Sequence, residues 1–123
     1  AVHAGWRGLY SDIIDNAIAA CPYPKNQLQA WLGPSISQQC YPVGPELYAK
    51  FIEKNINYQA YFYKNKDKYY PDLKAIAKDQ LQKHNIYHIS MDNTCTYSSA
   101  KLPSYRRDKI YSTRFACCIW IQE

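Results

Sequence analysis

The sequence lacks the features that mark several large classes of protein. No apolar run is long enough to cross a membrane and no signal peptide is visible, so we expect a cytoplasmic protein with no membrane partner. The five cysteines contain no Cys-x-x-Cys pair, which argues against a zinc finger or a thioredoxin-like redox motif. Because their number is odd, free thiols in a reducing compartment are the expected state.

The sequence also lacks a long basic run and any recognition motif for nucleic acid. Its net charge is nevertheless +5, from 15 Lys and Arg against 10 Asp and Glu. Most lysines lie between positions 50 and 83, mixed with acidic residues, as on a solvated helix or loop surface. A basic balance of this kind fits a small anionic ligand such as phosphate, and nucleic acid is not an expected partner.

No internal repeat or low-complexity linker divides the 123 residues, so one domain is expected. Apolar spacing and cap residues predict helices alternating with strands, hence an α/β domain with a mixed β-sheet and helices packed on its outside. The predicted helices span 8–21, 45–54 and 72–84, and the predicted strands span 1–4, 28–32, 58–63, 86–90 and 115–121. The last strand is apolar throughout, as in a sheet covered on both faces.

The start of the chain is the first candidate for chemistry. His3 and Arg7 lie in the run Val-His-Ala-Gly-Trp-Arg-Gly, between a predicted strand end and a predicted helix. Histidine ligates metals, arginine holds carboxylates or phosphates, and a helix N-terminus suits an anion. The alternative is a histidine packed in the core. Since the chain has no initiator Met and so few residues before His3, we expect a longer protein whose N-terminal part is missing here.

Two further segments carry reactive side chains. Arg106 and Arg107 are adjacent, so in a strand they point to opposite faces; one can serve a site while the other pairs with Asp108 or faces solvent. A surface salt bridge is the alternative. Cys40 and Cys95 lie in loops, where a nucleophile would need a neighbouring base, and no order of Cys, His and Asp indicates a triad. We expect His84 and His88 to be structural or surface residues.

These segments, in this order, resemble the laccase-domain family, also called the polyphenol oxidase or YfiH-like family. The resemblance lies in Val2 to Gly8, in the Leu-Gly-Pro loop and Val-Gly turn of 32–44, in Cys95 to Tyr97, and in Ser104 to Asp108. It covers the whole chain but only the C-terminal half of a usual family member. It implies the YfiH-like fold, of the cysteine hydrolase type, with residues 1–123 as the C-terminal part of one laccase-type domain.

The resemblance also implies a function. Family members are zinc-dependent purine nucleoside enzymes that phosphorolyse adenosine, guanosine and inosine and deaminate adenosine. Their zinc has two His ligands and one Cys ligand, of which only His3 lies in this chain. Arg7 and Arg106 or Arg107 would bind phosphate, and Tyr105 would stack on or hydrogen-bond the base. The expected partners are therefore a purine nucleoside, phosphate and the missing N-terminal half.

Two other functions stay open. Copper-dependent polyphenol oxidation is an older family description, but multicopper oxidases need many His ligands and this chain has three. A catalytically silent fragment or interaction module is the other alternative, and we expect this chain alone to be inactive. Three departures from the family pattern stand near the motifs: Pro42, Pro103 and the Ser-Thr-Arg of 112–114.

Overall fold

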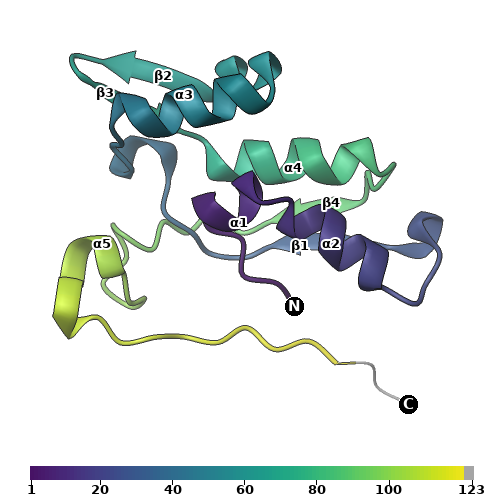
Figure 1. Ribbon diagram of the computed structural model, residues 1–123. Coiled ribbons are helices and arrows are strands. Elements are labelled where there is room, and N and C mark those ends of the chain that lie inside the picture. The colour runs from purple at the N-terminus through teal and green to yellow at the C-terminus, as the bar shows by residue number, and fades with distance from the viewer. Residues whose placement is uncertain (121–123) are drawn as a thin grey trace.

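The computed structural model describes residues 1–120, and in them helices and strands alternate as the α/β prediction requires. Figure 1 shows helix α3 (Pro45–Lys54) and the hairpin of β2 (Phe62–Asn65) and β3 (Lys68–Pro71) on one side of helix α4 (Leu73–Lys83). Helices α1 (Trp6–Tyr10) and α2 (Ile13–Ala20) and strands β1 (Ala30–Leu32) and β4 (Ile89–Met91) lie on the other side.

The sheet is smaller than predicted. β1 and β4 form a parallel pair, from Ala30 opposite Ile89 to Leu32 opposite Met91, and β2 and β3 form a separate antiparallel hairpin. Within residues 1–120 there are thus two two-stranded sheets and not one mixed sheet. The strand predicted at 58–63 was wrong over most of its length: Ile56–Tyr61 is a 3-10 helix, which buries Tyr58 in the core.

The first 21 residues also differ from the prediction. Residues 1–4 form no strand, and the helix predicted over 8–21 is two helices, α1 and α2. The break lies at Asp12, whose φ of 59° is left-handed and ends the regular helical hydrogen bonding. Asp is one of the few residue types that enter this region at low cost. The Asp12 carboxylate pairs with Lys54 of α3 at 2.6 Å, which ties the break to the rest of the fold.

Helices α3 and α4 confirm the helix predictions, and their start signals are visible in the structure. Pro45 occupies the first turn of α3, where its missing N–H costs nothing. Asp72 caps α4, its carboxylate accepting the Ala75 N–H at 2.9 Å.

The core lies where α1, α2 and α3 meet α4. Leu9, Phe51 and Ile76 are fully buried there. Gln80, also buried, donates from Nε2 to the Leu9 carbonyl at 2.9 Å and to the Tyr58 hydroxyl at 3.0 Å. One amide therefore joins α1, α4 and the 3-10 helix at Ile56–Tyr61.

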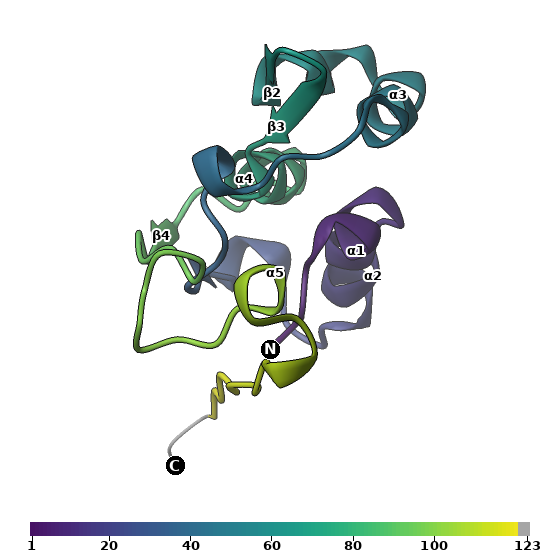
Figure 2. The ribbon, with the colours of Figure 1, turned by 90° about the vertical axis from the view of Figure 1, so that its left-hand side faces the viewer.

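The C-terminal part of the described chain lies outside this core. Helix α5 (Tyr105–Asp108) leads into a 3-10 turn at Lys109–Tyr111, and residues 112–120 then run beneath the molecule without regular structure (Figures 1 and 2). The predicted closing strand is wrong over 115–120, and position 121 lies outside the described residues. A strand that is apolar on both faces needs neighbours, and here Ile119 and Trp120 are 79% and 77% exposed.

No helix among residues 1–120 has both the length and the apolar character needed to span a membrane.

Candidate functional site

The segment that carries His3 is extended and leads into α1. The His3 side chain is exposed, which overturns the alternative of a core histidine. Its Nε2 lies 3.4 Å from the point where a Cβ on residue 5 would stand, so Gly5 leaves the ring room to rest against the backbone. An exposed imidazole beside bare backbone is accessible to a ligand from outside.

Arg7 lies in α1 and not, as predicted, just ahead of a longer helix. Its guanidinium stacks on the ring of Trp6, with Cζ 4.6 Å from the ring centroid. Lys50 of α3 brings its ammonium group to 5.8 Å from the same ring. Among residues 1–120 the exposed Arg7 enters no salt bridge within 4.0 Å, so its charge is available to an anion.

Tyr41 lies beside Arg106, and the charge of Arg7 also acts on its hydroxyl. It is buried, and the Arg106 guanidinium of α5 lies 4.7 Å from its ring centroid. Burial raises the pKa of the Tyr41 hydroxyl, while the charges of Arg106 and Arg7 oppose that rise. Both cations therefore act on one phenol, although they stand far apart in the sequence.

The loop that holds Tyr41 is fixed to the β2–β3 hairpin. Gln38 Nε2 donates to the Tyr70 carbonyl at 2.9 Å. Val43 and Tyr69 exchange backbone hydrogen bonds of 2.8 and 3.0 Å. Arg106 Nη1 completes the contact by donating to the Pro42 carbonyl at 3.1 Å. Hydrogen bonds to the β2–β3 hairpin therefore fix the loop that carries Tyr41, and Arg106 is bonded to that loop.

Arg107 has a different role from its neighbour. It pairs with Asp108 at 2.6 Å, which is one of the two roles predicted for the arginine that does not serve the site. The two arginines lie in a helical turn and not in the strand that was assumed. Its Nη atoms donate to four backbone carbonyls of the preceding loop, those of Thr96, Tyr97, Ser99 and Leu102. The hydrogen bond and charge of Arg107, with the Ser104 N–H, lower the pKa of Asp108. Arg107 organises a loop, which leaves Arg106 as the cation facing Tyr41.

Tyr105 is not drawn into this cluster. Its ring is 64% exposed, and the Arg114 guanidinium lies 5.8 Å from its centroid. His84 is structural, as expected: Nε2 contacts the Asp15 carboxylate, and Nδ1 lies 3.3 Å from Lys25 Nζ. The His88 side chain is exposed.

Tyr41 was missed from the sequence. The loop of 33–41 drew attention through Cys40, because a thiol is the more obvious reactive group. One sequence feature could have pointed to Tyr41. It is an aromatic residue directly before proline, in a loop that follows a strand, and functional residues often lie in such loops.

A metal ion would need more donors than this part of the chain brings together. Residues 1–120 contain no group of three His, Cys, Asp or Glu side chains able to hold one. Zinc in enzymes usually has three protein ligands, so His3 fits such a site only as one ligand of several.

Comparison with known proteins assigns the family. The family model described as "Multi-copper polyphenol oxidoreductase laccase" matches residues 1–122. A protein of Xylella fastidiosa (strain Temecula1) named purine nucleoside phosphorylase is 38% identical over 98% of this chain and 47% of its own length. One of Escherichia coli (strain K12), named purine nucleoside phosphorylase YfiH, is 33% identical over 98% of this chain and 50% of its own.

Solved structures agree with these matches. A Neisseria meningitidis protein of the DUF152 family superposes with a TM-score of 0.80 at 31% identity, covering 87% of this chain and 45% of the other. A Bacillus licheniformis hypothetical protein YfiH gives a TM-score of 0.73 at 26% identity, over 88% and 44%. The chain spans about half the length of the curated relatives it matches. From the extent of these matches, this chain belongs to the multi-copper polyphenol oxidoreductase laccase family, with the YfiH type of fold.

Proposed function

We propose that this chain supplies the phosphate side of a purine nucleoside phosphorylase site, the other side coming from residues outside the 123. The observation that carries the proposal is the Arg106 guanidinium over the ring of the buried Tyr41, together with the exposed Arg7 of α1, whose charge also acts on the Tyr41 hydroxyl. The names of the relatives support the reaction class, because several are called purine nucleoside phosphorylase.

Phosphate suits Arg7 and Arg106 on physical grounds. Phosphorolysis needs an inorganic phosphate held beside the sugar, and a guanidinium binds phosphate oxygens through two N–H donors. Arg7 is held by Trp6, and Arg106 is held by Tyr41 and the Pro42 carbonyl, so both cations are partly ordered before an anion arrives. Such preorganised positive charge also stabilises negative charge that develops during the reaction.

The purine base is assigned to Tyr105, the exposed residue that precedes Arg106. The exposed ring of Tyr105 offers a flat surface for stacking on a purine, and its hydroxyl can hydrogen-bond the ring nitrogens. Adenosine, guanosine and inosine share that purine face, so stacking accommodates all three. Deamination of adenosine is the second proposed activity of the same site.

His3 is proposed as one zinc ligand, with one His and one Cys supplied from outside this chain. Zinc bound there would polarise the substrate or lower the pKa of a water molecule. Copper-dependent phenol oxidation is the alternative that the family description favours. Three histidines in the whole sequence argue against several copper ions held within this chain.

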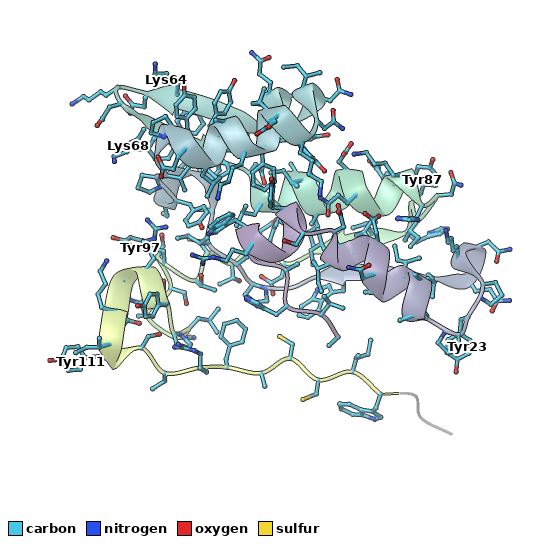
Figure 3. The ribbon with its side chains drawn as sticks, viewed as in Figure 1. Tyr23, Lys64, Lys68, Tyr87, Tyr97 and Tyr111 are labelled. Atoms are coloured by element: carbon cyan, nitrogen blue, oxygen red, sulfur yellow. The ribbon has the colours of Figure 1, made fainter. Side chains whose placement is uncertain are left out.

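The test joins this chain to the residues that precede the matching half of the Xylella fastidiosa relative. The chimera is assayed for phosphate-dependent release of adenine, guanine and hypoxanthine from their nucleosides, and for conversion of adenosine to inosine. Lys68→Ala is the matched control, since this exposed lysine lies on β3 of the hairpin, in a different part of the molecule from α5 (Figure 3). Loss of activity in Arg7→Ala and Arg106→Ala, with Lys68→Ala unchanged, is the expected result. Equal phosphate dependence in all three variants would contradict the assignment.

A further inference from the structure

Cys95 and Cys40 both hydrogen-bond to Ser37, away from Arg7 and Arg106. Cys95 follows β4 and pairs as an isolated parallel bridge with Ser35, which follows β1. This bridge places the Cys95 Sγ 3.3 Å from the Ser37 backbone N, which donates to the sulfur. The extension of the small parallel sheet thus fixes the position of the thiol.

Cys40 ends the short 3-10 turn, Gln38–Cys40, that follows Ser37. Its backbone N–H donates to the Ser37 carbonyl at 3.0 Å, so one residue, Ser37, binds both cysteine segments. The Cys40 Sγ lies 3.5 Å from the Ser98 hydroxyl oxygen. The Ser99 N–H donates to the Cys95 carbonyl at 2.9 Å and closes the turn that contains Ser98, so the Cys40 sulfur contacts the turn that begins at Cys95.

The surroundings favour the ionised form of Cys95. Partial burial raises the pKa of this thiol, but hydrogen bonds from Ser37 and Ser98 outweigh the burial and lower the pKa to about 6. At neutral pH the sulfur is then largely a thiolate, the form that acts as a nucleophile.

Cys95 is also reachable from solvent. It lines a cavity of about 360 Å³ whose other walls include Lys74 and Lys78 of α4 and Gln38. Both cysteines are partly exposed and neither is in a disulfide. A small polar oxidant can enter such a cavity, and the two lysines add positive charge to its wall.

We propose that Cys95 and Cys40 form an oxidisable thiol pair, a modification site at which a peroxide converts the two thiols into a disulfide. The Cys95 thiolate sulfur attacks one oxygen of hydrogen peroxide, and the O–O bond breaks. The other oxygen takes up a proton and leaves as water, so Cys95 becomes a sulfenic acid.

The second step uses Cys40. Its thiol loses a proton, its sulfur attacks the Cys95 sulfur, and the S–O bond of the sulfenic acid breaks. The oxygen leaves as a second water after taking up a proton. Two thiols have then been oxidised by two electrons, and one peroxide molecule has been reduced to two waters.

The experiment treats the native chain with hydrogen peroxide at neutral pH and maps its tryptic peptides without reduction. Cleavage after Lys and Arg leaves Cys40 in the peptide 26–50 and Cys95 in the peptide 84–101, while the other three cysteines lie in different peptides. The expected product is a 26–50/84–101 cross-link that disappears on reduction. Sulfinic acid at Cys95 without this cross-link, or a disulfide from Cys95 to any other cysteine, would overturn the proposal.

Two variants identify the order of steps. In Cys40→Ser the cross-link should be lost and Cys95 should accumulate as a sulfenic acid, trapped by dimedone. Cys21→Ser, which removes another partly exposed thiol, should leave the cross-link unchanged. Dimedone on Cys40 instead of Cys95 in the native chain would show that the roles are wrong. Mapping of the native chain needs no substitution, so the proposal stays testable if Cys40→Ser fails to fold.

Discussion

The Arg106 guanidinium lies over the Tyr41 ring, 4.7 Å from its centroid, and donates a hydrogen bond to the carbonyl of the next residue, Pro42. A cation held on an aromatic face and a backbone oxygen keeps N–H donors for a further partner, since a guanidinium has five. This contact makes Arg106, and not Arg107, the arginine to test first.

Removal of Arg106 should weaken the use of phosphate. A hydrogen bond to a charged group contributes about 1.5–3 kcal/mol. In the chimera, Arg106→Ala is therefore expected to lower phosphate-dependent turnover by about ten- to a hundredfold, mainly through a higher KM for phosphate. Arg7→Ala should act in the same direction. Phosphate saturation curves that match those of the parent would assign both arginines a purely structural role.

His3 is expected to matter for metal content and not for folding. Its side chain is exposed, so His3→Ala removes no core contact. In the chimera this change should lose most of the bound zinc, as measured by elemental analysis, with an unchanged circular dichroism spectrum. His88→Ala is the matched control, because that histidine is also exposed. Unaltered zinc stoichiometry in His3→Ala would remove His3 from the ligand set.

The 123-residue chain by itself should neither bind zinc tightly nor cleave adenosine. Zinc affinity depends on several deprotonated ligands acting together, and His3 is one. Adding the N-terminal half of the relative, fused or as a second chain, should restore both properties. Phosphorolysis and deamination assays on the isolated chain with added zinc decide the matter: robust turnover there would place the ligand set within these residues.

The reactivity of Cys95 should depend little on pH above neutrality. With a thiol pKa of about 6, it is mostly ionised at pH 7, whereas an ordinary thiol is only half ionised at about pH 8.5. The rate of iodoacetamide labelling of the peptide 84–101 should fall as pH drops below about 6 and be nearly flat above about pH 7. A rate that keeps rising about tenfold per pH unit through pH 8 would indicate an unshifted thiol.

Phe51 should be the most costly of the α3 side chains to truncate. It is fully buried and makes edge contacts with Tyr10 and Tyr58. Phe51→Ala is expected to lower the free energy of unfolding by about 3–5 kcal/mol in urea titration. Phe115→Ala, at a 44% exposed position, should change it by less than about 0.5 kcal/mol. Equal losses for the two variants would mean that the core has been misplaced.

The sequence allowed the helices with clear end signals to be predicted. Pro45 and Asp72 mark the starts of α3 and α4, and local chemistry decides both. The split between α1 and α2 was not predictable from apolar spacing, because it depends on the left-handed Asp12 and its ion pair with Lys54 in another helix. The segment of 58–63 has strand-forming residues, yet Tyr58 turns inward to meet Gln80 and Phe51.

The same distinction holds for the candidate site. His3, Arg7 and Arg106 carry their chemistry in their residue types and could be proposed from the motifs. Tyr41 could not, because its importance comes from Arg106 of α5, which is distant in the sequence and lies over the Tyr41 ring. The separation of Arg106 from Arg107 likewise needs the structure, which shows four carbonyls around one guanidinium.

The uncovered C-terminal run has a consequence for handling the protein. Ile119 and Trp120 expose most of their surface to water, in a stretch whose backbone has no strand partner among the described residues. Apolar, β-prone segments of this kind pair readily with one another between molecules. The colloidal behaviour of this chain should therefore depend on concentration, with light scattering that rises steeply on concentrating the sample and falls when Ile119 and Trp120 are replaced by lysine.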